Sequence, residues 1–190
     1  MIRIVVGLVA GVLLLAGCTT PEPGHDSTRN ADDLLATHDL DGLDGQEVVE
    51  RLDLTPVAER PGDLLASVRP GEVVLADEDG AEVSLALPDD QFYVSIAPYV
   101  DRTHECFFHS LTTCLGELQN EEVTVQVINE ADGTTLVDEE LRTYDNGFVG
   151  LWLPRDIDAT VTIEHDGRIA TGPISTSDDA PTCLTTFRLT

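Results

Sequence analysis

The sequence contains no lysine, and its ten positively charged side chains are arginines set against 36 aspartates and glutamates. The formal net charge is therefore −26 at pH 7. Nucleic acids and anionic lipid headgroups are bound through clusters of basic side chains, so this composition argues against both partners. Hydrophobic residues still make up 42% of the chain, enough to bury a core, so we expect the excess acid on a solvated surface.

Common catalytic motifs are also missing. The chain has no phosphate-binding G-x-x-x-x-G-K-[ST] loop, no H-E-x-x-H pair and no G-x-S-x-G turn. It also lacks C-x-x-C, the usual spacing of a redox-active cysteine pair. We therefore expect a protein that is not an enzyme.

The longest apolar run, residues 4–16, follows Arg3 near the N-terminus. At about 13 residues it is shorter than the roughly 20 that a membrane-spanning helix needs, and it has the form of a signal peptide. The run ends in Leu15-Ala16-Gly17-Cys18, which matches a bacterial lipobox. We predict a lipoprotein signal peptide over residues 1–17, lipidation of Cys18, and an extracytoplasmic protein held on the membrane by its lipid anchor alone. The alternative is an ordinary cleaved signal peptide that happens to contain a cysteine.

Composition and periodicity divide the remaining chain into three parts. Residues 18–29 are polar and read as the lipidated cysteine and a flexible linker. Residues 30–98 form a predicted small α+β domain. In it, Asp44 and Glu47 cap one helix, Pro61-Gly62 opens a second, and Asp79-Gly80 closes a hairpin.

Residues 99–190 are predicted to be a β-rich domain. Val123, Val125 and Val127 alternate with polar residues, as in a half-buried strand, and Asn-Gly and Asp-Gly turns separate further short strands. The fold class is therefore α+β, with a small N-terminal α+β domain followed by a mainly antiparallel, sandwich-like C-terminal domain.

With Cys18 lipidated, the thiols of Cys106, Cys114 and Cys183 remain, an odd number in an oxidising compartment. On one continuous helix, residues eight apart would lie about 12 Å apart along the axis. The segment must therefore bend if Cys106 is to meet Cys114. We expect Ser110 to cap a helix that carries Cys114, with Cys106 folded back beside it.

The residues alone leave three interpretations of these thiols open. The first is a structural disulfide with one spare thiol, for which all three pairings remain open. The second is a redox-active pair. The third is a soft-metal site, in which three thiolates suit Cu(I), His104 and His109 can assist, and zinc is the competing metal as Cys₃His.

Three long strings resemble the CueP family of exported copper-binding proteins. They are HECFFHSLTTCLGEL over residues 104–118, TYDNGFVGLWLPR over 143–155 and PTCLTT over 181–186. The pieces ASVRP at 66–70 and FYVSIAPY at 92–99 are also similar to the family. The resemblance thus extends over most of the chain that follows the signal peptide.

The resemblance implies a two-domain periplasmic copper protein in which Cys106, Cys114 and Cys183 supply the copper-binding sulfurs. It also allows a homodimer formed through the N-terminal unit. From it we expect binding of Cu(I) for copper buffering, tolerance or delivery, with a copper donor or a copper-dependent envelope enzyme as partner. Reduction of Cu(II) by the thiols is a secondary hypothesis. The alternatives are a disulfide-stapled envelope binding module with no metal role, or a thiol–disulfide redox protein.

Overall fold

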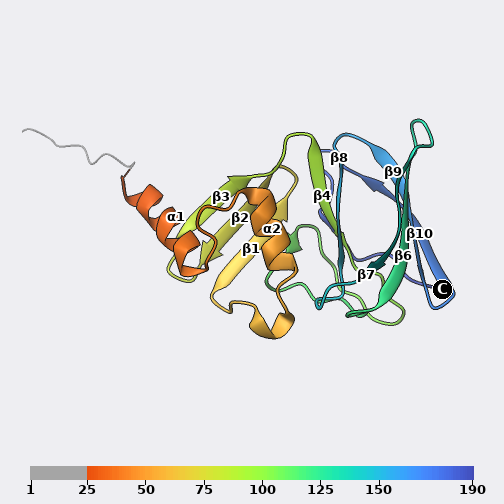
Figure 1. Cartoon of the computed structure of the whole chain (residues 1–190), viewed down its shortest axis with the longest axis horizontal. Helices are drawn as coiled ribbons and strands as arrows, with labels where there is room; N and C mark the ends of the chain where they lie inside the picture. Colours follow the sequence, from red (N-terminus) through yellow and green to blue (C-terminus); the bar gives the residue numbers. More distant parts are fainter. Residues whose placement is uncertain (1–24) are drawn as a thin grey trace, which may run out of the picture.

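The computed structural model describes residues 25–190, and their side chains from residue 31 onward (Figure 1). The signal peptide, the lipobox and Cys18 lie outside these residues. Helix α1 (His25–Thr37) begins inside the predicted linker. No helix in the described part of the chain has the length and apolar character needed to cross a membrane.

Helix α2 (Gly45–Asp53) begins as the sequence predicts. The Asp44 carboxylate accepts a hydrogen bond from the amide of Glu47 at 2.9 Å, and the Glu47 carboxylate accepts one from the amide of Asp44 at 2.9 Å. This reciprocal pair satisfies two amide groups at the start of the helix. Val48, Val49 and Leu52 form its buried face, and a short 3₁₀ turn, η1 (Val57–Glu59), follows.

The prediction of a helix after Pro61-Gly62 is wrong, because this segment forms strand β1 (Leu64–Arg69). Its inward residues, Leu64, Ala66 and Val68, recur every second position, which is the period of a strand. The first sheet runs in the order β3-β2-β1-β5, and helix α2 lies across it in Figure 1. Its other strands are β2 (Glu72–Asp77), β3 (Glu82–Ala86) and β5 (His109–Ser110).

The C-terminal half contains two facing sheets that enclose one apolar core, so the predicted sandwich-like architecture is confirmed (Figure 1). One sheet has the order β10-β9-β6-β7 and is antiparallel throughout. The other has the order β11-β4-β8, with β11 parallel to β4. The strands are β4 (Gln91–Ile96), β6 (Glu122–Asn129), β7 (Thr135–Arg142), β8 (Val149–Pro154), β9 (Asp158–His165), β10 (Arg168–Ser175) and β11 (Cys183–Leu184).

The segment between β4 and β6 connects the two halves of the molecule and contains only the short strand β5. The prediction of a helix after Ser110 is wrong, because the chain forms only a short turn there. The Ser110 hydroxyl does accept a hydrogen bond from the amide of Thr113 at 3.2 Å, but the chain leaves this turn within a few residues. The amide of Gly116 donates instead to the carbonyl of Asn146 at 2.6 Å, so it is not available to a helix.

Gly116 and Gly147 allow two loops to touch at this point. A Cβ on Gly147 would lie 2.8 Å from the backbone of Gly116, and one on Gly116 would lie 2.7 Å from the backbone of Gly147. Gly147 also has a φ of +80°, a conformation that glycine adopts without strain. The pair therefore holds the loop after Cys114 against the loop that carries Asn146.

Candidate metal centre

Backbone pairing brings Cys183 to Cys106 from the other end of the sequence. Cys183 lies in β11, opposite Ser95 of β4. Its amide donates a hydrogen bond to the carbonyl of Phe107 at 3.1 Å, which holds the neighbouring Cys106 beside it. Cys106 and Cys183 are joined as a disulfide with their Cα atoms 5.7 Å apart.

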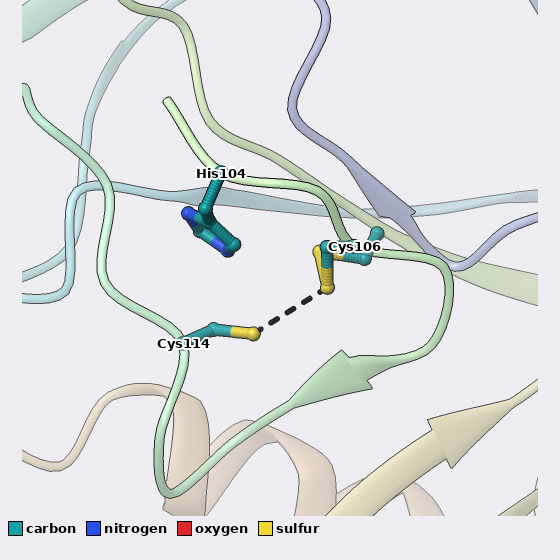
Figure 2. A group of neighbouring side chains, drawn as sticks. His104, Cys106 and Cys114 are labelled. Carbon is teal, nitrogen blue, oxygen red and sulfur yellow. Dashed lines mark hydrogen bonds between the residues drawn. A yellow bond between two sulfur atoms is a disulfide. The ribbon is translucent and has the colours of Figure 1, made fainter. Parts of the chain in front are cut away.

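Cys114 is a buried free thiol next to this disulfide. Its sulfur lies 3.6 Å from the sulfur of Cys106, as Figure 2 shows, and accepts a hydrogen bond from the amide of Ser110 at 3.4 Å. Three sulfurs from two segments far apart in the sequence therefore meet at one point.

Of the two histidines predicted near the thiols, His104 belongs to this cluster. Its ring nitrogen and the three sulfurs all lie within 4.8 Å of one another, and Figure 2 shows its ring beside Cys106 and Cys114. His109 is arranged differently. It is fully buried, and its Nε2 lies 3.0 Å from a carboxylate oxygen of Asp53.

The Asp53 carboxylate is the centre of a buried polar network behind the sulfurs. Besides His109, the amide of Asn146 donates to it at 2.7 Å, and the hydroxyl of Tyr93 donates to its second oxygen. The Asp53 side chain is 1% exposed. Burying a carboxylate is costly unless it is hydrogen-bonded, and these three donors satisfy that requirement.

The pKa values of this network follow from burial and charge. Burial alone would raise the pKa of Asp53, but the charge of His109 and the three hydrogen bonds outweigh it, and the pKa falls below 3.8. Burial likewise opposes the charged form of His109, yet Asp53, with a smaller effect of Cys114, raises its pKa to about 9. Burial raises the pKa of the Cys114 thiol, while His109, the Ser110 amide and Arg60 lower it to a net value below 9.0.

The raised pKa of His109 predicts a loss of stability in alkali. A group whose pKa rises from 6.5 to about 9 on folding stabilises the fold fully below pH 6.5, and that contribution disappears as the pH rises through about 9. In a Cys114→Ser protein, which removes the opposing shift of the thiol, we expect the free energy of unfolding to fall by roughly 2 kcal/mol between pH 7 and 10. Urea unfolding at a series of pH values measures this. A Cys114→Ser/His109→Gln protein is the control, and an equal slope in both proteins would contradict the assignment.

Two charged side chains hold the loops around the sulfurs. The Glu117 carboxylate accepts hydrogen bonds from the amides of Val100, Asp101 and Arg102, at 2.7, 2.9 and 3.2 Å, just before His104. The Arg60 guanidinium donates to the carbonyl of Cys114 at 2.8 Å. Glu117 therefore holds the loop that precedes His104, and Arg60 holds the backbone at Cys114.

A surface cleft of about 510 Å³ reaches the site, and His104, Cys106 and Cys114 are among its lining residues. Phe108 and Leu115 also line this cleft, and they are 40% and 50% exposed. The sulfurs are thus reached through an opening with an apolar rim.

Asp53, Tyr93, Asn146 and Glu117 were not predicted as site residues. Asp53 carried a signal, because it lies four residues after Val49 and so continues the buried stripe of α2. A carboxylate at such a position needs a partner. The sequence gives no indication which distant donors supply it.

Three cysteine sulfurs and an imidazole meet at one opening of this α+β protein, a donor set that could hold a soft metal ion. The family model described as "Periplasmic copper-binding protein CueP" matches residues 47–188, and the chain belongs to this family. It is also similar to a solved structure titled "Crystal Structure of S.CueP", with 40% sequence identity and a TM-score of 0.78. That match covers 84% of this chain and 97% of the other. No curated protein matches the chain.

Membership of this family makes copper the metal of the protein and places it outside the cytoplasm. The family is one of copper-binding proteins and not of enzymes. The donor set fits copper, because thiolates are soft ligands that favour Cu(I) and imidazole can complete its coordination.

Proposed function

We propose that this protein binds one Cu(I) ion through the thiolates of Cys106, Cys114 and Cys183, and buffers or delivers copper in the cell envelope. The observation that carries the proposal is the meeting of three sulfurs within 4.8 Å of one another. Since β11 and the loop before β5 lie far apart in the sequence, chain connectivity alone does not bring them together.

His104 is the imidazole that we propose as an additional ligand. Its ring nitrogen lies within the same 4.8 Å cluster as the sulfurs. His109 remains a second candidate of lower rank, because it is not among the four residues whose ligand atoms lie within 4.8 Å of one another.

The disulfide supplies a redox control on this site. While Cys106 and Cys183 are joined, Cys114 is the one thiol left in the cluster. Opening the bond takes two electrons and two protons from an external dithiol reductant and restores three thiols. In the other direction, two thiols that close into a disulfide release two protons and two electrons, enough to reduce two Cu(II) ions to Cu(I). Reduction of Cu(II) and tight binding of Cu(I) therefore compete for the same sulfurs.

We further propose that Cys18 carries a lipid anchor, and that a copper donor or a copper-dependent envelope enzyme exchanges the ion at the cleft. The apolar rim at Phe108 and Leu115 supports exchange by direct contact, because exposed apolar groups beside a site favour docking. A homodimer through the N-terminal unit stays a prediction from the family resemblance.

An anaerobic titration of the reduced protein, starting after Cys18, tests the proposal. Cu(I) is added in competition with a chromophoric Cu(I) chelator. We expect one tightly bound ion per chain. Weak binding, or no competition with the chelator, would return the cysteines to a structural role.

A further inference from the structure

We infer that Asp53 is a positioning residue for the copper site, because it holds the His109 ring with one nitrogen directed to the carboxylate and the other left for the sulfur of Cys114. This inference rests on the proposed Cu(I) site, adds Asp53 to it, and gives His109 a role there other than that of a ligand. Asp53 belongs to helix α2, far in the sequence from every cysteine of the cluster.

The first step of the argument is that Asp53 is held rigidly. Its carboxylate accepts hydrogen bonds from His109, Asn146 and Tyr93, and each donor comes from a different segment of the chain. A buried carboxylate with three donors has little freedom to rotate. The acceptor presented to His109 is therefore fixed.

The second step concerns the His109 ring. Nε2 is engaged with Asp53, whereas Nδ1 is buried and has no hydrogen-bond partner in the part of the chain that the structure describes. Buried polar atoms almost always have a partner, so an unpartnered ring nitrogen calls for an explanation. The His109 ring packs on Phe148, which lies in the same buried cluster as Cys114, and after Asp53 the Cys114 thiol is the group that raises the pKa of the ring.

The third step is the packing that keeps the ring in this place. The ring centroid of His109 lies 4.7 Å from that of Phe148, which packs in the same buried cluster as Cys114 and Cys183. The amide of His109 donates to the hydroxyl of Thr182, the neighbour of Cys183, at 3.0 Å. Ring packing on Phe148 and this backbone hydrogen bond therefore hold His109 beside the segments that carry Cys114 and Cys183.

A carboxylate that binds one nitrogen of a histidine and thereby orients the other is a common arrangement around protein metal sites, where loss of the outer partner lowers metal affinity about 10–100-fold. In the arrangement inferred here, His109 would direct its free nitrogen to the sulfur of Cys114. We expect removal of Asp53 to weaken Cu(I) binding by the same factor, because the ring can then turn away from Cys114.

Nuclear magnetic resonance of the imidazole nitrogens in the reduced wild-type protein tests this without any substitution. Long-range proton–nitrogen correlation spectra are recorded before and after one equivalent of Cu(I). We expect the Nδ1 resonance of His109 to shift, while the resonances of His38 and His165, which lie outside the cluster, stay in place. An unchanged His109 resonance in protein that has bound Cu(I) would overturn the inference.

Substitutions provide a second test, in which Cu(I) affinity is measured by chelator competition. Asp53→Ala and His109→Ala are each expected to bind about 10–100-fold more weakly. The double variant is expected to be no weaker than His109→Ala, because Asp53 acts through His109. Asp53→Asn, whose amide oxygen can still accept from Nε2, should recover most of the affinity.

Glu50→Ala is the matched control, since it removes an exposed carboxylate from the same helix, one that accepts a hydrogen bond from Gln46 and takes no part in the Asp53 network. It should keep wild-type affinity, and Trp152 fluorescence reports whether each variant is folded. Wild-type affinity in folded Asp53→Ala and His109→Ala proteins would overturn the inference while leaving the three-thiolate proposal standing. Failure of the wild-type protein to bind Cu(I) would instead overturn the proposed function.

Discussion

The oxidised protein, with Cys106 and Cys183 joined, is expected to bind Cu(I) roughly 10⁴-fold more weakly than the reduced protein. A four-ligand zinc site contributes about 10–16 kcal/mol, so one ligand accounts for roughly 3 kcal/mol, or about a hundredfold in affinity. The disulfide removes two thiolates at once. The sulfur of Cys114 and the ring of His104 are then the donors left in the cluster.

Chelator competition on oxidised and reduced samples of the same preparation measures this difference. Alkylation and mass spectrometry first establish the state of each sample, with one reactive thiol expected in the oxidised protein, assigned to Cys114. Reduction by a phosphine should restore the affinity, which controls for damage during oxidation. Equal affinity in both states would mean that Cys106 and Cys183 do not bind the ion, and would favour the disulfide-stapled binding module.

Each of Cys106→Ser, Cys114→Ser and Cys183→Ser is expected to lower the Cu(I) affinity of the reduced protein by roughly a hundredfold. A serine hydroxyl is a hard donor that Cu(I) disfavours, so each change removes one soft ligand. The three losses should be similar, because the sulfurs occupy one cluster and each provides a single ligand atom.

Thr113→Ala is the matched control for these variants. Thr113 is exposed, neighbours Cys114 in the sequence, and its hydroxyl binds Ser110 and not a sulfur. Its affinity should equal that of the wild type. A cysteine whose replacement leaves the affinity unchanged would be assigned to structure, and the site would be reduced to two sulfurs.

Local patterns predicted much of the fold. The Asp44 and Glu47 capping box, the hairpin at Asp79-Gly80 and the alternating valines of β6 depend on neighbours within a few residues, and the structure confirms them. The segment that begins at Leu64 fits both periods, because Leu64, Leu65 and Val68 suit one face of a helix while Leu64, Ala66 and Val68 suit one face of a strand. Pairing with β2 and β5 decided in favour of a strand, and that pairing lies outside any local window.

The candidate site was predictable in its residue types and not in its geometry. Bending of the segment between Cys106 and Cys114 followed from helix dimensions, but the predicted helix after Ser110 did not form. Contact between Gly116 and Gly147 shapes that loop, and it involves residues about thirty positions apart. The pairing of Cys106 with Cys183 could not be deduced either, since it depends on β11 joining β4.

The roles of the two histidines could not be separated from the sequence, because His104 and His109 lie at similar distances along the chain from Cys106. In the folded protein, contact with Asp53 distinguishes His109 from His104. Asp53 engages His109 from helix α2, whereas His104 lies among the sulfurs. The long-range contact between helix α2 and His109 therefore assigns a different position to each ring.

X-ray absorption at the copper edge of the Cu(I)-loaded, reduced protein counts the sulfur ligands and so tests the central claim most directly. The account predicts three sulfur scatterers in the first coordination shell, and two in each single cysteine-to-serine variant. Two or fewer sulfurs around the copper of the wild-type protein would contradict a three-thiolate site.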